Sequence, residues 1–310
     1  MLVETRIERH DMKESIKKEE PITKRQHYVP QFYLYLFADN DNKLHVFNIK
    51  KEKWFSCPPK NICYKDYLYE TPWEEANPDL EKLVLPNQIE KNFGERESAY
   101  KALLKKIIEI CSNPANKKAL ICNSEEKKTL AQFTANLLLR NEWSMKKHET
   151  DFSITQIDDP EFQKIDQLLQ DMNWGGTKTL ISAANKKLWL DESFGGNTTL
   201  GISNQLFELN FSILTPEEGR FITSGFPVIY ETYDDEDGLT YPKCFYLPIH
   251  PRYALLYNCV NSARNYRNRL IAIPQEKVDI FNRAYLKEDP NQIKYLISDD
   301  ERYLVNLVQT

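Results

Sequence analysis

The hydrophobic pattern of this chain of 310 residues changes from a helical to a strand period, which limits the folds that it can adopt. From about residue 86 to residue 148, apolar side chains recur at the spacing of amphipathic helices. Gly94 is a candidate for a break in the first of these helices, and Ser124 is a suitable N-cap for the second. Weaker helical patterns follow, so we expect a helical middle over about residues 80–195.

After about residue 200, short runs rich in β-branched and aromatic residues predict strands. The runs are QLFELNFSIL, GRFITS, FPVIYET, KCFYLPI and YALLYNCV. We expect GRFITS, FPVIYE and KCFYLPI to share one sheet in a sheet-rich part, about residues 200–260. KLHVFNIK and KWFSC predict a hairpin near the N-terminus, with DYLYET as a further short strand. The fold class is therefore α+β, with an N-terminal hairpin, a helical middle and a C-terminal antiparallel sheet.

The N-terminal segment and the cysteines indicate how the chain is divided into domains and in which cell compartment it lies. Residues 1–23 form a charged leader without the apolar core of a secretion signal, and residues 24–310 then form a single domain. No apolar run reaches the roughly 18 residues of a membrane span. The six cysteines contain no C-x-x-C pair and are most simply buried thiols in a reducing compartment. We expect a cytoplasmic protein that does not bind membranes.

The run KRQHYVPQFYLYLFADN, residues 24–40, places a histidine beside a dense group of aromatic side chains. Pro30 suits the first turn of a short helix, and its ring restricts Val29 to an extended path. The aromatic side chains must pack in a core, so we expect His27 to be less than about half exposed. His27 could then act as a base, an acid or a ligand, or it could be a core histidine bonded to a backbone carbonyl.

The same run resembles the opening of a widespread bacterial family, known as domain of unknown function 4238. Its HYVP-x-F-Y-L box corresponds to His27–Leu34, and its mid-chain Q-x-x-x-x-x-x-x-R pattern corresponds to Gln132–Arg140. Its T-S-D-x-P box is similar to TSGFP at Thr223–Pro227, and a proline-flanked strand is similar to LPIHP at Leu247–Pro251. The resemblance covers about residues 24–260 and implies little chemistry.

One departure from the family pattern bears on function. Gly225 stands where the family usually has aspartate. If that aspartate were a metal ligand or a base, this chain would lack it. The resemblance then favours chemistry elsewhere or an altered member of the family.

The stretch TLAQFTANLLLRNEW carries a polar stripe on an otherwise apolar helix. Gln132, Asn136 and Arg140 follow one another at intervals of four residues, so they lie on one face. Buried polar groups need hydrogen-bond partners, which could be protein groups or an anion held by the Arg140 fork. We expect Arg140 and His27 to face a common polar cavity, with Gln132 and Asn136 as ligand-binding candidates.

Carboxyl and hydroxyl groups supply the remaining site candidates. Glu90 and Glu97 are seven residues apart and share a helix face, with Glu97 the stronger candidate for a site near Arg140. A solvated helix face is the alternative for both. Thr223 and Ser224 lie at a strand end, where they could contact a phosphate or cap the turn.

Two functions remain open from the sequence. The first is a hydrolase acting on phosphodiesters, or a nuclease-type effector, with His27, Glu97 and Arg140 as catalytic residues. The second is a ligand-binding or sensing module without catalysis. Nucleic acid or a nucleotide is the candidate partner, although the net charge of −5 gives no general attraction to it. The cofactor is not determined, a divalent metal ion is one candidate, and no set of metal ligands is identified.

Overall fold

The structure is a computed structural model, and it describes most of the chain with internal gaps. The described residues are 21–70, 87–113, 115, 120–151, 160–173, 175–177, 179–180, 183–184, 198–234, 240–258 and 268–309. Most of the predicted leader, residues 1–23, therefore lies outside the described residues. Helices and sheets are both present in this part, which confirms the α+β fold class.

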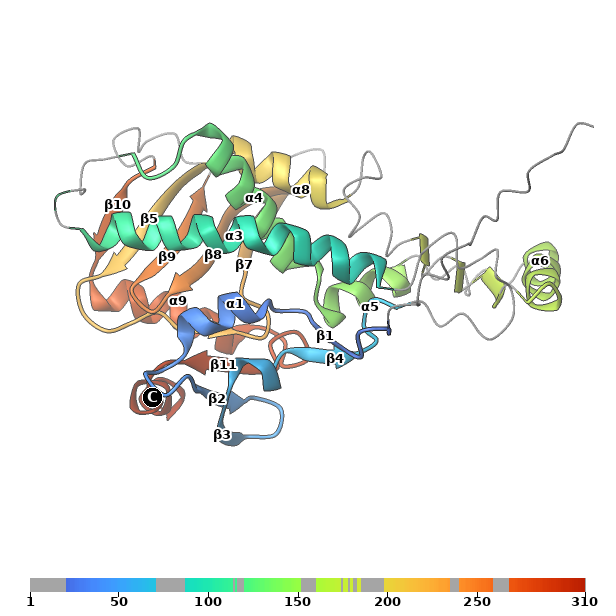
Figure 1. Cartoon of the computed structure of the whole chain (residues 1–310), viewed down its shortest axis with the longest axis horizontal. Coiled ribbons are helices and arrows are strands. Elements are labelled where there is room, and N and C mark those ends of the chain that lie inside the picture. The colour runs from blue at the N-terminus through green and yellow to red at the C-terminus, as the bar shows by residue number, and fades with distance from the viewer. Residues whose placement is uncertain are drawn as a thin grey trace, which may run out of the picture.

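Helices occupy the middle of the chain and also flank its strands (Figure 1). The α-helices are α1 (Gln31–Leu34), α3 (Gln88–Ser112), α4 (Ser124–Leu139), α5 (Glu142–Asp151), α6 (Pro160–Asp171), α8 (Thr198–Glu208), α9 (Gln275–Lys287) and α10 (Glu301–Gln309). Two short 3-10 helices are η1 (Tyr35–Phe37) and η2 (Pro59–Asn61). None of the helices in the described ranges combines the length and the apolar character needed to cross a bilayer.

The largest sheet has five strands in the order β10-β5-β9-β8-β7. Its strands are β5 (Asn210–Pro216), β7 (Ile229–Asp234), β8 (Thr240–His250), β9 (Tyr253–Asn258) and β10 (Leu270–Ile273). Neighbouring strands are antiparallel except β10 and β5, which are parallel. The predicted C-terminal antiparallel sheet is thus present, with one parallel edge.

A second sheet joins the two ends of the chain in the order β3-β2-β11-β6. Its strands are β2 (Leu44–Asn48), β3 (Lys53–Cys57), β6 (Thr223–Ser224) and β11 (Tyr295–Ser298). The hairpin β2–β3 confirms the predicted N-terminal hairpin, and β11 extends it from the far end of the sequence. A separate pair, β1 (Arg25–His27) and β4 (Tyr64–Asp66), fixes the start of the aromatic run.

Our expectation that GRFITS, FPVIYE and KCFYLPI share one sheet is wrong. Only Thr223 and Ser224 of the first run form a strand, β6, and it pairs with β11 in the four-stranded sheet. The hydroxyl of Ser224 closes a tight turn, because it donates to Phe226 O at 2.6 Å and accepts from Phe226 N at 3.0 Å. This turn separates β6 from β7, which lies in the five-stranded sheet.

Three helix boundaries also differ from the sequence expectations. α3 continues through Gly94, which is exposed, so the absent side chain leaves no gap in the core. The N-cap of α4 is Asn123 rather than Ser124, because Asn123 forms a capping box with Glu126. The start of the run QLFELNFSIL is helical, since Leu206 of α8 is fully buried and continues the helical period.

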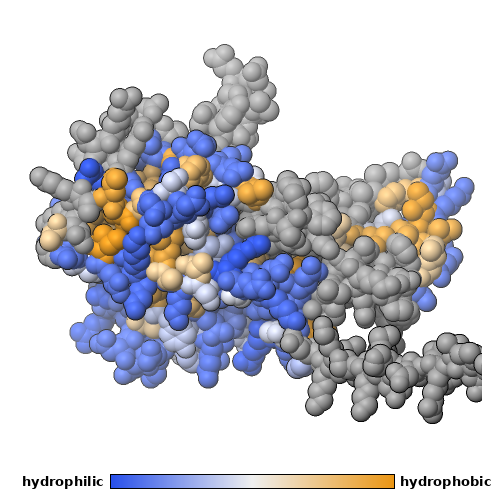
Figure 2. Space-filling model, turned by 45° about the horizontal axis from the view of Figure 1, so that its top comes forward, coloured by the Kyte–Doolittle hydropathy of each residue, from blue (hydrophilic) through white to orange (hydrophobic). Residues whose placement is uncertain are grey.

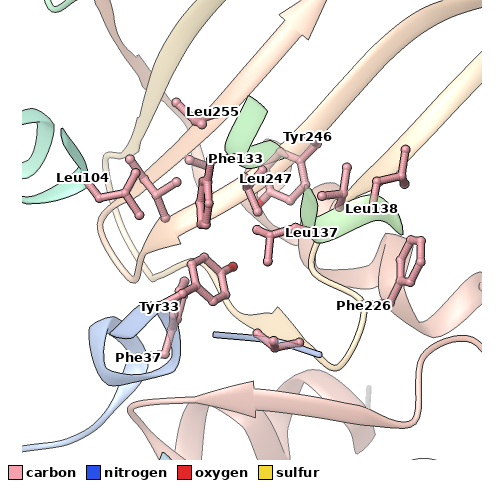
Figure 3. Close-up of a cluster of buried hydrophobic side chains, with 14 of the residues drawn as sticks. Tyr33, Phe37, Leu104, Phe133, Leu137, Leu138, Phe226, Tyr246, Leu247 and Leu255 are labelled. Atoms are coloured by element: carbon pink, nitrogen blue, oxygen red, sulfur yellow. The ribbon is translucent and has the colours of Figure 1, made fainter. Parts of the chain in front are cut away.

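The aromatic run enters the core between the helical layer and the two sheets. Tyr33 and Phe37 are fully buried and lie below Phe133 and Leu137 of α4, with Tyr246 of β8 beyond them (Figure 3). The ring centroids of Tyr33 and Phe133 are 6.0 Å apart. This packing explains why α1 and η1 form immediately after Pro30, as the sequence predicted.

Helix α6 lies apart from this core (Figure 1). Ile165, Leu168 and Met172 of this region are exposed, and a hydrophobic group is visible at the corresponding end of the molecule (Figure 2). No residue of α6 is buried.

Candidate functional site

Arg140 occupies the point where α4 ends and the chain turns into α5. Its backbone N–H donates to Asn136 O as the C-cap of α4. The next residue, Asn141, accepts a hydrogen bond from Ser144 N at 2.9 Å and donates to Leu138 O at 2.9 Å. Asn141 thus caps both helices, which is why the predicted helix from Ser124 to about His148 is divided into two.

The Arg140 side chain is buried and makes polar contacts with α3, with β1 and with the loop after β4. Nη1 lies 3.0 Å from Glu97 Oε1, and Nη2 donates to His27 O at 2.7 Å. Nε donates to Tyr69 OH at 3.3 Å, and Tyr69 OH donates to Arg140 O at 2.9 Å. The guanidinium carbon lies 4.0 Å above the centre of the Phe93 ring. Burial alone would lower the pKa of Arg140, but Tyr69 and Glu97 raise it, so the side chain is charged.

His27 is buried with 8% exposure, as the sequence predicted. Its imidazole is not the group that contacts Arg140, because the arginine binds the backbone carbonyl. Nδ1 lies 3.4 Å from Gln31 Nε2, and the imidazole also interacts with the backbone of Lys60, in keeping with a core histidine bonded to the main chain. Burial lowers the pKa of His27 from 6.5 to about 4; the positive charges of Arg140 and Arg25 add to the shift, and the backbone of Lys60 opposes it. The imidazole is therefore neutral at pH 7.

Glu97 and Glu90 approach Arg140 from α3. Glu97 forms the ion pair with Arg140 and keeps 29% of its side chain exposed. Glu90 Oε2 is buried without a hydrogen-bond partner in the described ranges. Burial raises the pKa of Glu90 from 4.5 to about 7; Arg140 opposes the shift, and Glu97 and Glu70 add to it. A substantial fraction of Glu90 is thus protonated near neutrality.

The polar stripe of α4 meets the site only in part. Asn136 is buried and donates from Nδ2 to Tyr100 OH at 2.8 Å, whereas its Oδ1 has no partner within the described residues. Gln132 is half-buried on the same helix. The ligand-binding roles of Gln132 and Asn136 remain predictions.

Thr223 and Ser224 lie elsewhere, in the core, and both are fully buried. Thr223 Oγ1 lies 2.7 Å from Tyr33 OH, and Tyr33 OH donates to Pro248 O at 2.6 Å. Ser224 caps the turn to Phe226. These contacts favour the capping alternative for Ser224 and a packing role for Thr223, and a contact with ligand stays a prediction.

Gly225, where this chain departs from the family pattern, is buried within the turn from Ser224 to Phe226. A Cβ atom there would lie 3.5 Å from Tyr295 Cδ2 and 3.9 Å from Cys63 Sγ. These are ordinary van der Waals distances, so the backbone could carry a small side chain at this point. An aspartate would point into the core near Tyr295 and Cys63.

The structure thus brings Arg140, Glu97 and the backbone of His27 into direct contact. We call Arg140, Glu97, Glu90, Tyr69 and His27 the Arg140 cluster. Sequence reasoning missed Tyr69, which follows a turn after β4, and ranked Glu90 below Glu97. Within the ranges described, no group of three or more His, Cys, Asp or Glu side chains could hold a metal ion.

Comparison with known proteins supports the family resemblance. Residues 25–293 match the family described as "Protein of unknown function (DUF4238)". The chain belongs to the DUF4238 family. No curated protein and no solved structure matches this chain.

Proposed function

We propose that this DUF4238 protein is a ligand-binding module whose Arg140 cluster holds a small, positively charged organic molecule. The observation that carries the proposal is Glu90. Its Oε2 atom is buried without a partner among the described residues, and its pKa is raised to about 7. An ammonium group on the ligand would supply the missing donor and would favour the ionised carboxylate.

The charge balance of the cluster supports a cation rather than an anion. Arg140 is charged, but the ion pair with Glu97 matches that charge. His27 is neutral at pH 7, and Glu70 and Glu90 also act on the same region. Three carboxyl groups, those of Glu70, Glu90 and Glu97, thus face the two guanidinium groups of Arg140 and Arg25, so the region is acidic once Glu90 ionises and favours a cation over a phosphate.

The donors of Arg140 support the same conclusion. Its Nε, Nη1 and Nη2 atoms all bind protein oxygen atoms, so the guanidinium is not presented as an open fork to a phosphate. His27 does not add a second unpaired group, because its imidazole interacts with the backbone of Lys60. The ligand therefore has to supply only a donor for Glu90.

Thermal denaturation with small probes tests this proposal. Ethanolamine has an ammonium group and a hydroxyl group, and ethylene glycol is its neutral counterpart of similar size. We expect ethanolamine to raise the melting temperature of the wild type, and ethylene glycol to leave it unchanged, since only a bound ligand stabilises the folded state.

A matched pair of α3 variants locates the effect. Glu90→Gln should abolish the shift, whereas Glu109→Gln, at an exposed carboxylate on the same helix, should retain it. A shift produced by inorganic phosphate instead of ethanolamine, or an ethanolamine shift that persists in Glu90→Gln, contradicts the proposal.

A phosphodiester hydrolase or nuclease-type effector is the second candidate, because the pKa values of His27 and Glu90 are displaced in opposite directions. A neutral imidazole could accept a proton and a protonated carboxyl group could donate one at pH 7. In this alternative Arg140 and Glu97 position the substrate, and nucleic acid or a nucleotide is the partner. The acidic surplus of the cluster places it second.

Cleavage assays decide between the two candidates. DNA, RNA and bis(p-nitrophenyl) phosphate should be incubated with the wild type in the presence and absence of Mg²⁺ or Mn²⁺. Cleavage that disappears in His27→Gln and in Glu90→Gln, but not in Glu109→Gln, would establish the hydrolase. No cleavage, together with stabilisation by ethanolamine, establishes the binding module.

We also propose a reducing compartment, and specifically the cytoplasm. Cys57, Cys63, Cys111 and Cys122 are free thiols. Free thiols in this number are typical of proteins kept under reducing conditions. Fractionation of cells that express a tagged full-length chain tests the assignment, and recovery outside the cytoplasmic fraction contradicts it.

A further inference from the structure

A second polar group lies on the four-stranded sheet, among residues that the Arg140 cluster does not use. His45 of β2 and Ser56 of β3 are direct neighbours across the hairpin. Ser56 Oγ lies 3.1 Å from His45 Nδ1, and His45 Nε2 lies 3.0 Å from Asp39 Oδ2. A hydroxyl, an imidazole and a carboxylate thus form one continuous hydrogen-bonded series.

The carboxylate of this series is held in a fixed orientation. Asp39 Oδ1 accepts hydrogen bonds from Asp41 N at 2.9 Å and from Lys43 N at 2.8 Å. Burial would raise the pKa of Asp39, but the backbone N–H groups of Lys43 and Asp41 and the side chain of His45 lower it. Asp39 is therefore ionised at neutral pH and can only accept a hydrogen bond.

The ionised Asp39 determines which nitrogen of His45 carries the proton. Nε2 must donate to Asp39, which leaves Nδ1 as an acceptor for the hydroxyl proton of Ser56. A nucleophile next to a base that is oriented by a third group is the arrangement used in covalent catalysis. In the usual serine triad, Nε2 faces the serine and Nδ1 faces the carboxylate. In this chain Nδ1 faces Ser56 and Nε2 faces Asp39, but the proton still passes from the hydroxyl to the imidazole.

Ser56 is also accessible. It is exposed on β3, an edge strand that pairs with β2 alone among the described strands. Glu301 Oε2, at the start of α10, lies 4.0 Å from His45 Nδ1. This second carboxylate would stabilise the imidazolium that forms when Nδ1 accepts a proton.

We propose that Ser56 is an activated nucleophile that accepts acyl groups from small carboxylic esters. Ser56 Oγ attacks the carbonyl carbon while its proton passes to His45 Nδ1. The alkoxide then leaves with that proton, and an acyl group remains on Ser56 until water hydrolyses the new ester. The negative charges of Asp39 and Glu301 favour neutral acyl donors over anionic phosphoryl donors.

The structural alternative is that the three side chains only join β2 to β3 and to the turn at residues 39–43. Acetylation of the full-length protein by p-nitrophenyl acetate separates the two. We expect a burst of p-nitrophenol and one acetyl group on Ser56, identified by peptide fragmentation. General-base assistance should make Ser56 react on the order of 100-fold faster than an unassisted serine.

Four variants complete the test. Ser56→Ala and His45→Gln should lose the burst, and Cys57→Ser should retain it, which excludes the neighbouring thiol. Ser112→Ala removes an exposed hydroxyl that donates to Ile108 O, without an imidazole partner, and should also retain the burst.

Asp39→Asn provides a readout that a merely structural role would not change. The amide oxygen can still accept from the backbone of residues 41 and 43, so we expect a nearly unchanged melting temperature. Its NH₂ group would instead donate to His45 Nε2, which moves the imidazole proton to Nδ1 and removes the base. The burst should fall with the fold intact. A burst that survives in His45→Gln, or acetylation spread over lysines without Ser56, overturns the proposal.

Discussion

Replacement of Arg140 by alanine should lower the free energy of unfolding by about 3–5 kcal/mol, the range seen when one partner of a buried ion pair is removed. The side chain is 3% exposed and has polar contacts at three of its nitrogen atoms. Alanine removes all of these contacts and also the contact with the Phe93 ring. The loss should therefore be large for a single substitution.

The groups left behind determine where in this range the loss falls. Glu97 is 29% exposed, so water can solvate its carboxylate after the ion pair is lost. Tyr69 OH lies 2.9 Å from the carbonyl of residue 140 and 3.2 Å from His27 O, so its single proton serves only one of these two buried carbonyls at a time. Solvation of Glu97 reduces the cost of unpaired groups, which is about 1–3 kcal/mol for each buried atom. We therefore expect a value near the lower limit, about 3 kcal/mol.

Equilibrium unfolding in urea, followed by tryptophan fluorescence, measures this change. Arg252→Ala is the matched control, because Arg252 binds the carbonyls of Pro216 and Gly219 from an exposed position. We expect this control to lose less than about 0.5 kcal/mol. A loss below about 1 kcal/mol for Arg140→Ala would refute the reasoning, because the contacts of the guanidinium would then contribute little to the fold.

The two displaced pKa values and the glycine at the family box give three further predictions. Because the pKa of Glu90 is raised from 4.5 to about 7, folding favours its protonated form, and the wild type should lose stability relative to Glu90→Gln as the pH rises through this window. Because the pKa of His27 is lowered from 6.5 to about 4, the wild type should lose stability relative to His27→Gln as the pH falls from 6.5 to 4. Urea unfolding over both pH windows measures these differences, and parallel profiles for variant and wild type contradict the corresponding prediction. Gly225→Ala should change the free energy of unfolding by less than about 1 kcal/mol, since the added Cβ meets its neighbours only at 3.5 Å or beyond. Gly225→Asp should lower the free energy of unfolding by more, because it buries a carboxylate. Equal losses in the two variants contradict this account.

The fold class and the aromatic core could be predicted from the sequence because both depend on local patterns. Periodicity identified α3 and α4, and the run from Tyr28 to Phe37 had to be buried somewhere. Pairing between distant strands could not be predicted in this way. β11 joins the N-terminal hairpin to β6, and no local pattern indicates this partner.

In the candidate site, too, local patterns could be predicted from the sequence and long-range contacts could not. The spacing of Asn136 and Arg140 indicated a buried polar face, and Glu97 was correctly expected near Arg140. The contact with His27 goes through its backbone carbonyl, which the sequence cannot indicate because every residue has one. Tyr69 and the buried oxygen of Glu90 depend on how the segment after β4 and the start of α3 are packed around Arg140. The series of Asp39, His45 and Ser56 requires the register of the hairpin and the path of the preceding turn.

The central claim is that Glu90 binds a cation in the Arg140 cluster, and the number of protons released on binding tests it most directly. Binding of a cation favours the ionised carboxylate, so the pKa of Glu90, about 7 in the free protein, should fall. Titration calorimetry with ethanolamine near pH 7, in two buffers with different ionisation enthalpies, counts the protons exchanged. We predict a net release of protons from the wild type and none from Glu90→Gln. Binding without proton release in the wild type, or the same release from both proteins, would contradict the claim.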